Sequence, residues 1–386
     1  MRKKIYLDYA AATPVDPRVM KVMKPYFSEK FGNTMSLHSF GQEGREVLEK
    51  SREAVAGSIK ARPKEIIFTS SATESNNLAL KGVAFANQEK GRHIIISPIE
   101  HPCVLESANW LAKQGFKITQ LPVDKFGLVN PADVEKAVKK DTILVSVIHA
   151  SNEIGTIEPI EEIGQICRKN RVYFHTDAAQ SFGKIPIDVN KMNVDLLTGS
   201  SHKIYGPKGA ALLFIKEGVK IEPILHGGAH EFKLRGGTVN LPAVVGFSEA
   251  IKIRQKEMNG EIKRLTHLRD KLIENILKKI SGSHLNGHPK KRLPNNVNIR
   301  FDFIEGESLV LQLDGYGFMT TTGSACSSTD LKPSHILLAI GLRPQEAHGS
   351  LRMTLGKWTK EKDIDELLKV LPAAVERLRK LSPFKS

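Results

Sequence analysis

Polar and reactive side chains follow three predicted strands, each at the point where an apolar run ends. The first segment, residues 66–77 (IIFTSSATESNN), passes from a strand through a Ser/Thr-rich turn into a helix. The N–H groups at a helix start, with the hydroxyls of Ser71 and Thr73, form a cradle suited to a phosphate. On this segment alone, a helix capped by Thr73 that binds nothing is the favoured interpretation.

The second segment is VYFHTDAAQ at residues 172–180, and the third is TGSSHKIYGPKG at residues 198–209. Asp177 and Gln180 follow a strand, where open α/β sheets bind their ligands, and an Asp there can pair with a protonated ring nitrogen. Lys203 lies between two clusters of small residues. Lysines in such places form Schiff bases with carbonyl compounds when burial lowers their pKa. In isolation, a turn residue explains Asp177 equally well, and a surface lysine in a Gly/Pro loop is the favoured interpretation of Lys203.

Taken together, the three segments predict one cofactor. A phosphate cradle, an acid for a ring nitrogen and a Schiff-base lysine are what pyridoxal 5′-phosphate requires of a protein. The three features occur in that order along the chain, each at a strand end. We therefore expect pyridoxal 5′-phosphate to be the cofactor.

The chain resembles the cysteine desulfurases of the NifS and IscS type, in the class V aminotransferase group of fold-type I pyridoxal phosphate enzymes. The resemblance runs essentially from end to end. The motifs that carry it are YLDYAAATPVDPRV, IIFTSSATESNN, IEHPCV, ASNEIGTIEPI, HTDAAQ, SSHKIYGPKG, RGGTVN, GSACSS and SLRMTLG. The sequence departs from the family pattern at Ser71, Tyr9 and Cys103, and none of these departures removes a reacting group.

The resemblance implies a role for each site residue. Lys203 carries the cofactor as an aldimine, His101 stacks on the ring and handles the thiol proton, and Asp177 pairs with the ring nitrogen. Arg352 clamps the substrate carboxylate, because a guanidinium binds a carboxylate through two hydrogen bonds. The remaining cofactor contacts implied are the phosphate and ring-hydroxyl residues Ala72, Thr73, Asn152, Gln180, Ser200 and His202, with Asn152 also near the substrate.

Thr238, in the RGGT segment, matches a family threonine that reaches the phosphate of the other subunit. The resemblance therefore implies a homodimer with shared sites. It also implies conversion of L-cysteine to L-alanine, with the sulfur carried as a persulfide. The interval between Cys326 and Arg352 matches the longer-loop subgroup, whose members deliver sulfur to iron–sulfur scaffold and tRNA-thiolation proteins.

Three cysteines occur, and Cys326 is the candidate for sulfur transfer. The segment around it, TTTGSACSST, is small and polar with no apolar periodicity, so we expect it to move. Cys167 lies on the apolar face of a predicted helix and is expected in the core. Cys103 lies two residues from His101 and is expected to contribute to packing.

Two other classes of function remain open. One is a selenocysteine lyase or aminotransferase on the same fold, and the other is a binding module that recruits RNA.

Alternating strands and helices must position these residues. Short β-branched runs at 65–69, 93–97, 117–121, 142–148, 172–175, 196–198 and 210–215 alternate with helical patterns at 44–58, 74–87, 131–139 and 160–170. This alternation predicts an α/β fold with a mostly parallel central sheet and helices on both faces. A charged helical stretch at 243–280, punctuated by Asn259 and Gly260, precedes a polar loop at 281–294. We expect a large cofactor-binding domain at 15–255, and a small α+β domain from 1–14 and 256–386.

Composition excludes several classes. Hydrophobic residues make up 40% and charged residues 26% of the 386 residues, which is ordinary for a globular protein and excludes extended disorder, collagen and disulfide scaffolds. No apolar run approaches the roughly 18 residues of a membrane span, and Asp8 interrupts the N-terminal apolar stretch, so a cytoplasmic protein is expected. The net charge of +15 is spread along the chain without a nucleic-acid-binding motif. Neither the cysteines nor the histidines of HGGAH show metal-ligand spacing, so no metal is expected.

Overall fold

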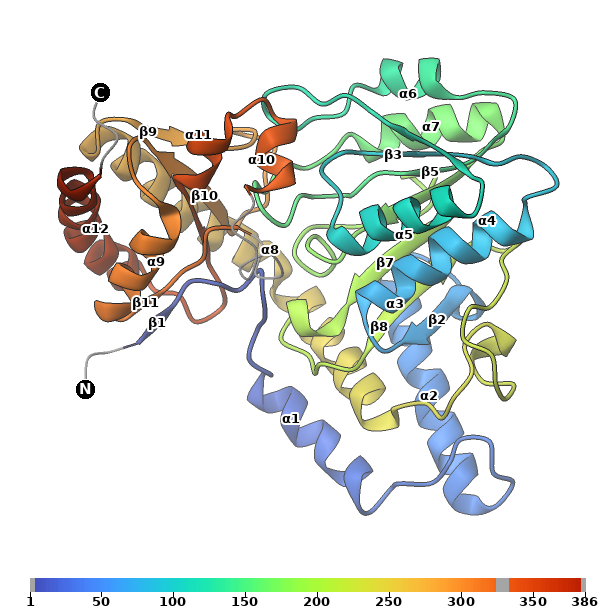
Figure 1. Ribbon diagram of the computed structural model, residues 1–386. Helices are drawn as coiled ribbons and strands as arrows, with labels where there is room; N and C mark the ends of the chain where they lie inside the picture. The colour runs from blue at the N-terminus through green and yellow to red at the C-terminus, as the bar shows by residue number, and fades with distance from the viewer. Residues whose placement is uncertain (1–3, 324–332, 383–386) are drawn as a thin grey trace.

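The structure is a computed structural model that describes residues 4–323 and 333–382. A seven-stranded sheet forms its larger part, with the strand order β2-β8-β7-β6-β5-β3-β4 (Figure 1). β8 runs antiparallel to both of its neighbours, and the other contacts in the sheet are parallel. The predicted mostly parallel sheet is thus confirmed. Its strands are β2 (Ile66–Thr69), β3 (His93–Ile96), β4 (Lys117–Gln120), β5 (Thr142–Ser146), β6 (Tyr173–Asp177), β7 (Leu196–Ser200) and β8 (Ala211–Ile215).

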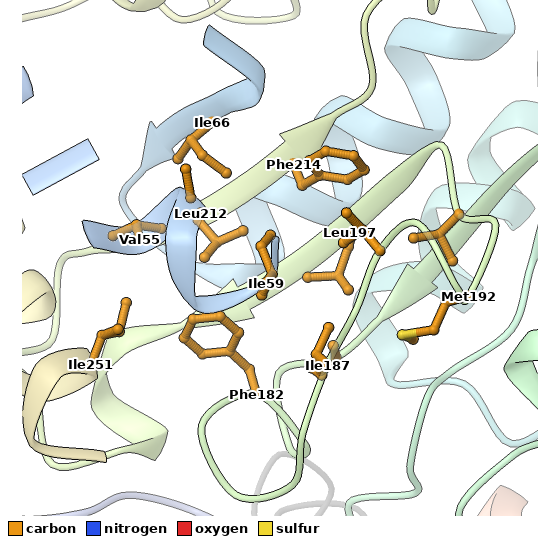
Figure 2. Packing of buried hydrophobic residues seen from close by; sticks show 14 of the residues in the cluster. Val55, Ile59, Ile66, Phe182, Ile187, Met192, Leu197, Leu212, Phe214 and Ile251 are labelled. Atoms are coloured by element: carbon orange, nitrogen blue, oxygen red, sulfur yellow. The ribbon is translucent and has the colours of Figure 1, made fainter. Parts of the chain in front are cut away.

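Helices cover both faces of this sheet, which explains why its strands are buried at almost every position except in the edge strand β4. On one face lie α1 (Pro17–Met23), α2 (Ser39–Ser58), α6 (Pro131–Ala137), α7 (Ile160–Asn170) and the first part of α8 (Leu241–Lys279). On the other lie α3 (Ala72–Asn77), the π-helix at Leu78–Gly82, α4 (Val83–Ala86) and α5 (Pro102–Lys113). Figure 2 shows part of the first core, where Val55 of α2 and Ile59 just after it pack against Ile66 and Leu212 of the sheet.

A smaller unit lies beside the large sheet and carries its own core. Its antiparallel sheet has the order β12-β10-β9, and β1 pairs in parallel with β11. Its strands are β1 (Ile5–Tyr6), β9 (Ser283–Leu285), β10 (Asn296–Phe301), β11 (Phe318–Met319) and β12 (Ser350–Thr354). Its longer helices are α9 (Gly306–Gly315) and α12 (Glu361–Leu381), while the short α10 (His335–Ala339) and α11 (Pro344–His348) lie toward the larger unit. The domain boundaries expected from the sequence stay a prediction.

The helix α8 joins the two units without interruption, which confirms the long helical stretch predicted at 243–280. Residues from Leu241 to Ile253 pack in the first core, and residues from Leu265 to Ile276 pack in the core of the smaller unit. A glycine costs a helix about 1 kcal/mol relative to alanine, which is small against two buried faces. The helix therefore continues through Gly260.

The stretch at 281–294, expected to be a polar loop, contains a short strand. Its first residues form β9, which pairs antiparallel with β10 in the register Ile299 to Leu285. A three-residue edge strand has too little periodicity to be recognised in a polar sequence. Within the described residues, no helix is long and apolar enough to cross a membrane.

Candidate active site

The predicted site residues gather at one edge of the large sheet. Asp177 ends β6, Ser200 ends β7, and Lys203 follows in a short 3₁₀ turn at Ser201–Lys203. His101 and Asn152 follow β3 and β5. Because these four strands are parallel neighbours, their carboxyl ends meet at the same edge.

His101 lies within the electrostatic reach of both Asp177 and Lys203. Burial lowers the pKa of its imidazole, the negative charge of Asp177 opposes that shift, and Lys203 and His335 reinforce it. Its Nδ1 accepts a hydrogen bond from the Cys103 N–H at 3.3 Å and lies 3.0 Å from the Cys103 sulfur. A lowered pKa keeps the ring neutral at physiological pH, which leaves it able to accept a proton.

Asp177 is a buried carboxylate held by uncharged donors. Its Oδ2 accepts a hydrogen bond from Asn76 Nδ2 at 2.7 Å, and its Oδ1 accepts one from the Ala179 N–H at 2.9 Å. Neutral donors compensate a buried negative charge only in part. A protonated ring nitrogen would complete this compensation, so the observed donor set fits the pyridinium of pyridoxal 5′-phosphate.

The phosphate side of the site is formed by α3 and by Ser200 and His202 at the end of β7, and α3 lies against β7. Ser71 caps the helix by accepting a hydrogen bond from the Glu74 N–H at 3.2 Å, not Thr73 as expected. The first N–H groups of a helix have no partner within it, so those of Ala72 and Thr73 suit an anion. The Ser200 hydroxyl lies 3.0 Å from Nδ1 of His202.

The charge state of His202 suits hydrogen bonding rather than ion pairing. Burial and the charges of nearby lysines lower the pKa of His202 to about 4. The side chain is therefore neutral at physiological pH and offers the proton on one ring nitrogen. Together with the Ser200 hydroxyl, it supplies a polar group of the kind that a phosphate ester requires.

Lys203 is held by the N-terminal segment of the chain. Its ammonium donates hydrogen bonds to the carbonyl oxygens of Ala10 and Ala11 at 2.6 and 2.7 Å. Gln180 donates to the same Ala10 carbonyl at 2.9 Å, and its own Oε1 accepts a hydrogen bond from Lys184 at 3.1 Å. Burial, followed by the charges of neighbouring cations, lowers the pKa of Lys184 to about 7.

Arg352 comes from β12 of the smaller unit and reaches the same edge. Its side chain is 3% exposed, and its two terminal nitrogens donate to Asp8 Oδ1 at 2.9 Å and to the Asn152 carbonyl at 3.0 Å. Asn152 Oδ1 is buried and has no hydrogen-bond partner among residues 4–323 and 333–382. The structure therefore brings Arg352 and Asn152 together, as the resemblance implies for the substrate site.

Two predicted residues are not placed in this group. Thr238 is exposed and follows the short 3₁₀ turn at Glu231–Lys233. Cys326 lies outside the described residues. Of the other cysteines, Cys167 is buried in the first core, as expected. Cys103 is also largely buried, and burial raises the pKa of its thiol to about 12.

Several site contacts were not assigned from the sequence. Asn76 binds Asp177, the Ala10 and Ala11 carbonyls bind Lys203, and Asp8 binds Arg352. Asn76 lies within the TESNN segment, and the other three residues lie within YLDYAAATP. Both segments are among the motifs of the resemblance. A contact made by a backbone carbonyl does not depend on the residue type, so the sequence cannot indicate it.

A twisted, mostly parallel sheet that places a lysine, a buried carboxylate and an anion cradle at its carboxyl edge defines the class of pyridoxal phosphate-dependent α/β enzymes. The family model described as Aminotransferase class-V matches residues 5–367 of the chain. Class V enzymes use pyridoxal 5′-phosphate, and the donors around Asp177 and Ser200 fit that cofactor.

Comparison with known relatives shows which members of this family the chain is similar to. The chain is 52% identical over 385 residues to the cysteine desulfurase IscS of Dictyoglomus turgidum, which covers 100% of this chain and 98% of that protein. It is also 52% identical to the cysteine desulfurase IscS 1 of Archaeoglobus fulgidus, covering 98% and 99%. Among solved structures, a NifS-like protein matches with a TM-score of 0.91 and 39% identity, covering 98% of this chain and 100% of that one. The chain belongs to the cysteine desulfurases of the class V aminotransferase family.

Proposed function

We propose that the protein is a pyridoxal phosphate-dependent cysteine desulfurase. It converts L-cysteine to L-alanine and passes the sulfur, as a persulfide of Cys326, to acceptors in iron–sulfur cluster assembly or tRNA thiolation. The observation that carries the proposal is that Lys203, His101 and the buried Asp177 follow neighbouring parallel strands at their carboxyl ends, where Arg352 also reaches the Asn152 carbonyl. Similarity to SspA, solved in complex with cysteine at 36% identity and a TM-score of 0.80, supports cysteine as substrate.

The cofactor would lie between His101 and the strand ends. Asp177 would pair with its ring nitrogen and Lys203 would hold it covalently. Bound there, pyridoxal 5′-phosphate draws electrons away from the α-carbon of an amino acid. The other residues proposed to hold it are the polar and backbone donors of the helix start and strand ends, namely Ala72, Thr73, Asn152, Gln180, Ser200 and His202.

The substrate carboxylate would bind Arg352. The guanidinium is already fixed, because Asp8 and the Asn152 carbonyl each accept one of its N–H groups. A fixed guanidinium orients a carboxylate through a pair of hydrogen bonds, which a lysine cannot do. The buried Asn152 Oδ1 lies beside it and offers an acceptor to the substrate.

Three protein groups then move protons and sulfur. The Lys203 amine removes the proton on the substrate α-carbon, and neutral His101 accepts the thiol proton. The Cys326 thiolate attacks the substrate sulfur, so an S–S bond forms while the bond from sulfur to the β-carbon breaks. The β-carbon keeps the electron pair and is protonated, which yields alanine and a persulfide on Cys326.

The surface of the described chain supports a homodimer. Large apolar side chains are exposed along residues 20–40, namely Met20, Phe27, Phe31, Met35, Leu37 and Phe40. Phe31 and Phe40 pack against each other with ring centroids 5.7 Å apart, and exposed apolar groups that lie together mark interaction sites. Thr238 is exposed as well, as a residue that completes the site of a second copy would be.

Product analysis tests the proposal. Purified holoprotein is incubated with L-cysteine and a thiol reductant, and alanine and sulfide are quantified. The proposal predicts equal amounts of both, and Arg352→Lys should raise KM because the paired hydrogen bonds are lost. Transfer of the amino group to a keto acid without sulfide would indicate an aminotransferase, and turnover of selenocysteine alone would indicate a selenocysteine lyase.

A further inference from the structure

The segment between β8 and α8 contains a strained turn. Glu231, Phe232 and Lys233 are consecutive residues with left-handed φ angles of 44°, 56° and 64°. Side chains disfavour this conformation, and it is rare for three non-glycine residues in a row. Such a turn persists only where the surrounding structure determines it.

Arg52 of α2 makes the contacts that hold this turn. Its Nη1 and Nη2 donate to the two carboxylate oxygens of Glu231, each at 2.8 Å. Glu231 also accepts a hydrogen bond from the Phe68 N–H of β2 at 2.7 Å, and Arg52 donates to the Ile66 carbonyl at 2.7 Å. The guanidinium lies 5.0 Å from the ring centroids of both Phe68 and Phe232.

The pair is shielded from solvent. The Arg52 and Glu231 side chains are 2% and 1% exposed. Buried charges that are paired and fully hydrogen-bonded hold a fixed geometry, whereas removal of one partner leaves an uncompensated charge. The strained turn is therefore fastened to α2 and β2 through one ion pair.

A second set of contacts holds residues 235–236, just before Thr238. Arg235 donates to Glu74 of α3 at 2.9 Å. Gly236 donates its N–H to the Leu225 carbonyl at 3.0 Å, and a Cβ on Gly236 would lie 2.8 Å from the Gly227 nitrogen. These contacts hold the chain between the turn and the exposed Thr238 on one fixed path.

We propose that Arg52 and Glu231 are positioning residues that act on the active site of the second subunit, by holding the turn that presents Thr238 to that subunit's cofactor phosphate. This inference rests on the proposed function, specifically on a homodimer in which Thr238 crosses between subunits. Both side chains are buried between α2 and β2, at 2% and 1% exposure, so neither is available to contact a cofactor. Their effect on a site is therefore exerted in trans.

Mixed dimers test the direction of the effect. Two differently tagged chains are co-expressed, and one carries Lys203→Ala so that only the other chain holds the cofactor covalently. Arg52→Met is placed on one chain or the other, and cofactor release after dilution is followed by absorbance. Release should be about tenfold faster when Arg52→Met is on the Lys203→Ala chain, the size of one lost hydrogen bond to a charged group. It should change less than about twofold when Arg52→Met is on the cofactor-holding chain.

Controls separate the possible failures. Lys50→Met, an exposed change on the same helix, should have no effect on either chain. If Arg52→Met does not fold, Glu231→Gln removes the charge, keeps the side-chain shape, and should give the same trans pattern. An effect on the mutated chain's own site, or no effect while Thr238→Ala on the Lys203→Ala chain does speed release, would overturn the inference. If Thr238→Ala has no trans effect, the shared site of the proposed function is itself wrong, and the inference falls with it.

Discussion

At the scale of single residues, burial decides which groups are charged. His101 and His202 are both driven toward the neutral state by burial, although they serve different sides of the site. The thiol of Cys103 is protonated for the same reason, so its place beside His101 does not make it a nucleophile. This supports the assignment of sulfur transfer to Cys326 and not to Cys103.

Lys203→Ala should abolish covalent attachment of the cofactor while the fold is retained. Lys203 is the lysine that the SSHKIYGPKG motif places at the sheet edge, and its amine is held by the Ala10 and Ala11 carbonyls. After borohydride reduction, mass spectrometry of the wild type should find the adduct on Lys203. Lys184→Met, at a neighbouring buried lysine, should keep the adduct. An adduct on another lysine of the Lys203→Ala variant would refute the assignment.

Glu100 gives a pH-dependent prediction for stability. The carboxyl is fully buried, accepts hydrogen bonds from Ser97 and the Ile148 N–H, and burial raises its pKa to about 8. The folded state therefore binds a proton that the unfolded state has lost, between the unfolded pKa near 4.5 and the folded pKa. The contribution of Glu100 to stability is present below pH 4.5 and declines by about 1.4 kcal/mol per pH unit as pH rises toward 8.

Glu100→Gln mimics the protonated acid and should not show this decline. Urea unfolding at pH 5 should give similar free energies for the variant and the wild type, and at pH 8 the variant should be more stable by about 1 kcal/mol or more. Glu106→Gln, at an exposed position of α5, is the matched control and should follow the wild type. An equal free-energy difference at both pH values would contradict the role of burial.

At the scale of elements, the sequence predicted the large sheet well, because buried parallel strands are short, apolar and β-branched. All seven expected strands are present within a few residues, and the sheet edge that positions Asp177 and Lys203 follows from them. The long helix α8 was also predicted, whereas the strand β9 could not be, because three residues of a polar edge strand carry too little periodicity. The contacts of Asp8 and Asn76 were missed because they join segments far apart in the chain.

Two glycines of α8 should respond oppositely to alanine. A Cβ at Gly260 meets nothing within 4 Å, so Gly260→Ala should stabilise the protein by about 0.5–1 kcal/mol through helix propensity. A Cβ at Gly246 would lie 2.5 Å from the Met23 sulfur and 2.9 Å from Pro207, so Gly246→Ala should destabilise it. Thermal unfolding compares the two, and a loss of stability in Gly260→Ala would show that the helix is not regular there.

At the scale of the whole molecule, the smaller unit completes the site that the large sheet begins. Arg352 lies on β12 but bonds to Asp8 and to the Asn152 carbonyl, so the proposed substrate site depends on contact between the two units. Thr238 is exposed in the single chain, and we propose that it completes the site of a second copy. The proposed enzyme is therefore complete only as a pair of chains.

The dimer is tested by hydrodynamics. The wild type should sediment as a homodimer, and Phe31→Glu should weaken the dimer because it places a charge among exposed apolar side chains. Lys50→Glu, on an exposed site away from these side chains, should leave the dimer intact. A wild-type monomer that retains full cofactor and activity would contradict the shared site.

The central claim is that Cys326 takes the sulfur from cysteine, and the most direct test is the Cys326→Ser variant. Lys203, Asp177 and Arg352 remain, so its absorbance spectrum should still change when L-cysteine is added. A serine hydroxyl cannot supply the nucleophile that a thiol with a pKa of about 8.5 provides. Alanine formation should fall by orders of magnitude, and mass spectrometry of the protein after brief exposure to L-cysteine should find no persulfide. Cys103→Ser and Cys167→Ser should keep most activity and the persulfide. Alanine formation by Cys326→Ser at the wild-type rate, or a persulfide on Cys103, would contradict the mechanism.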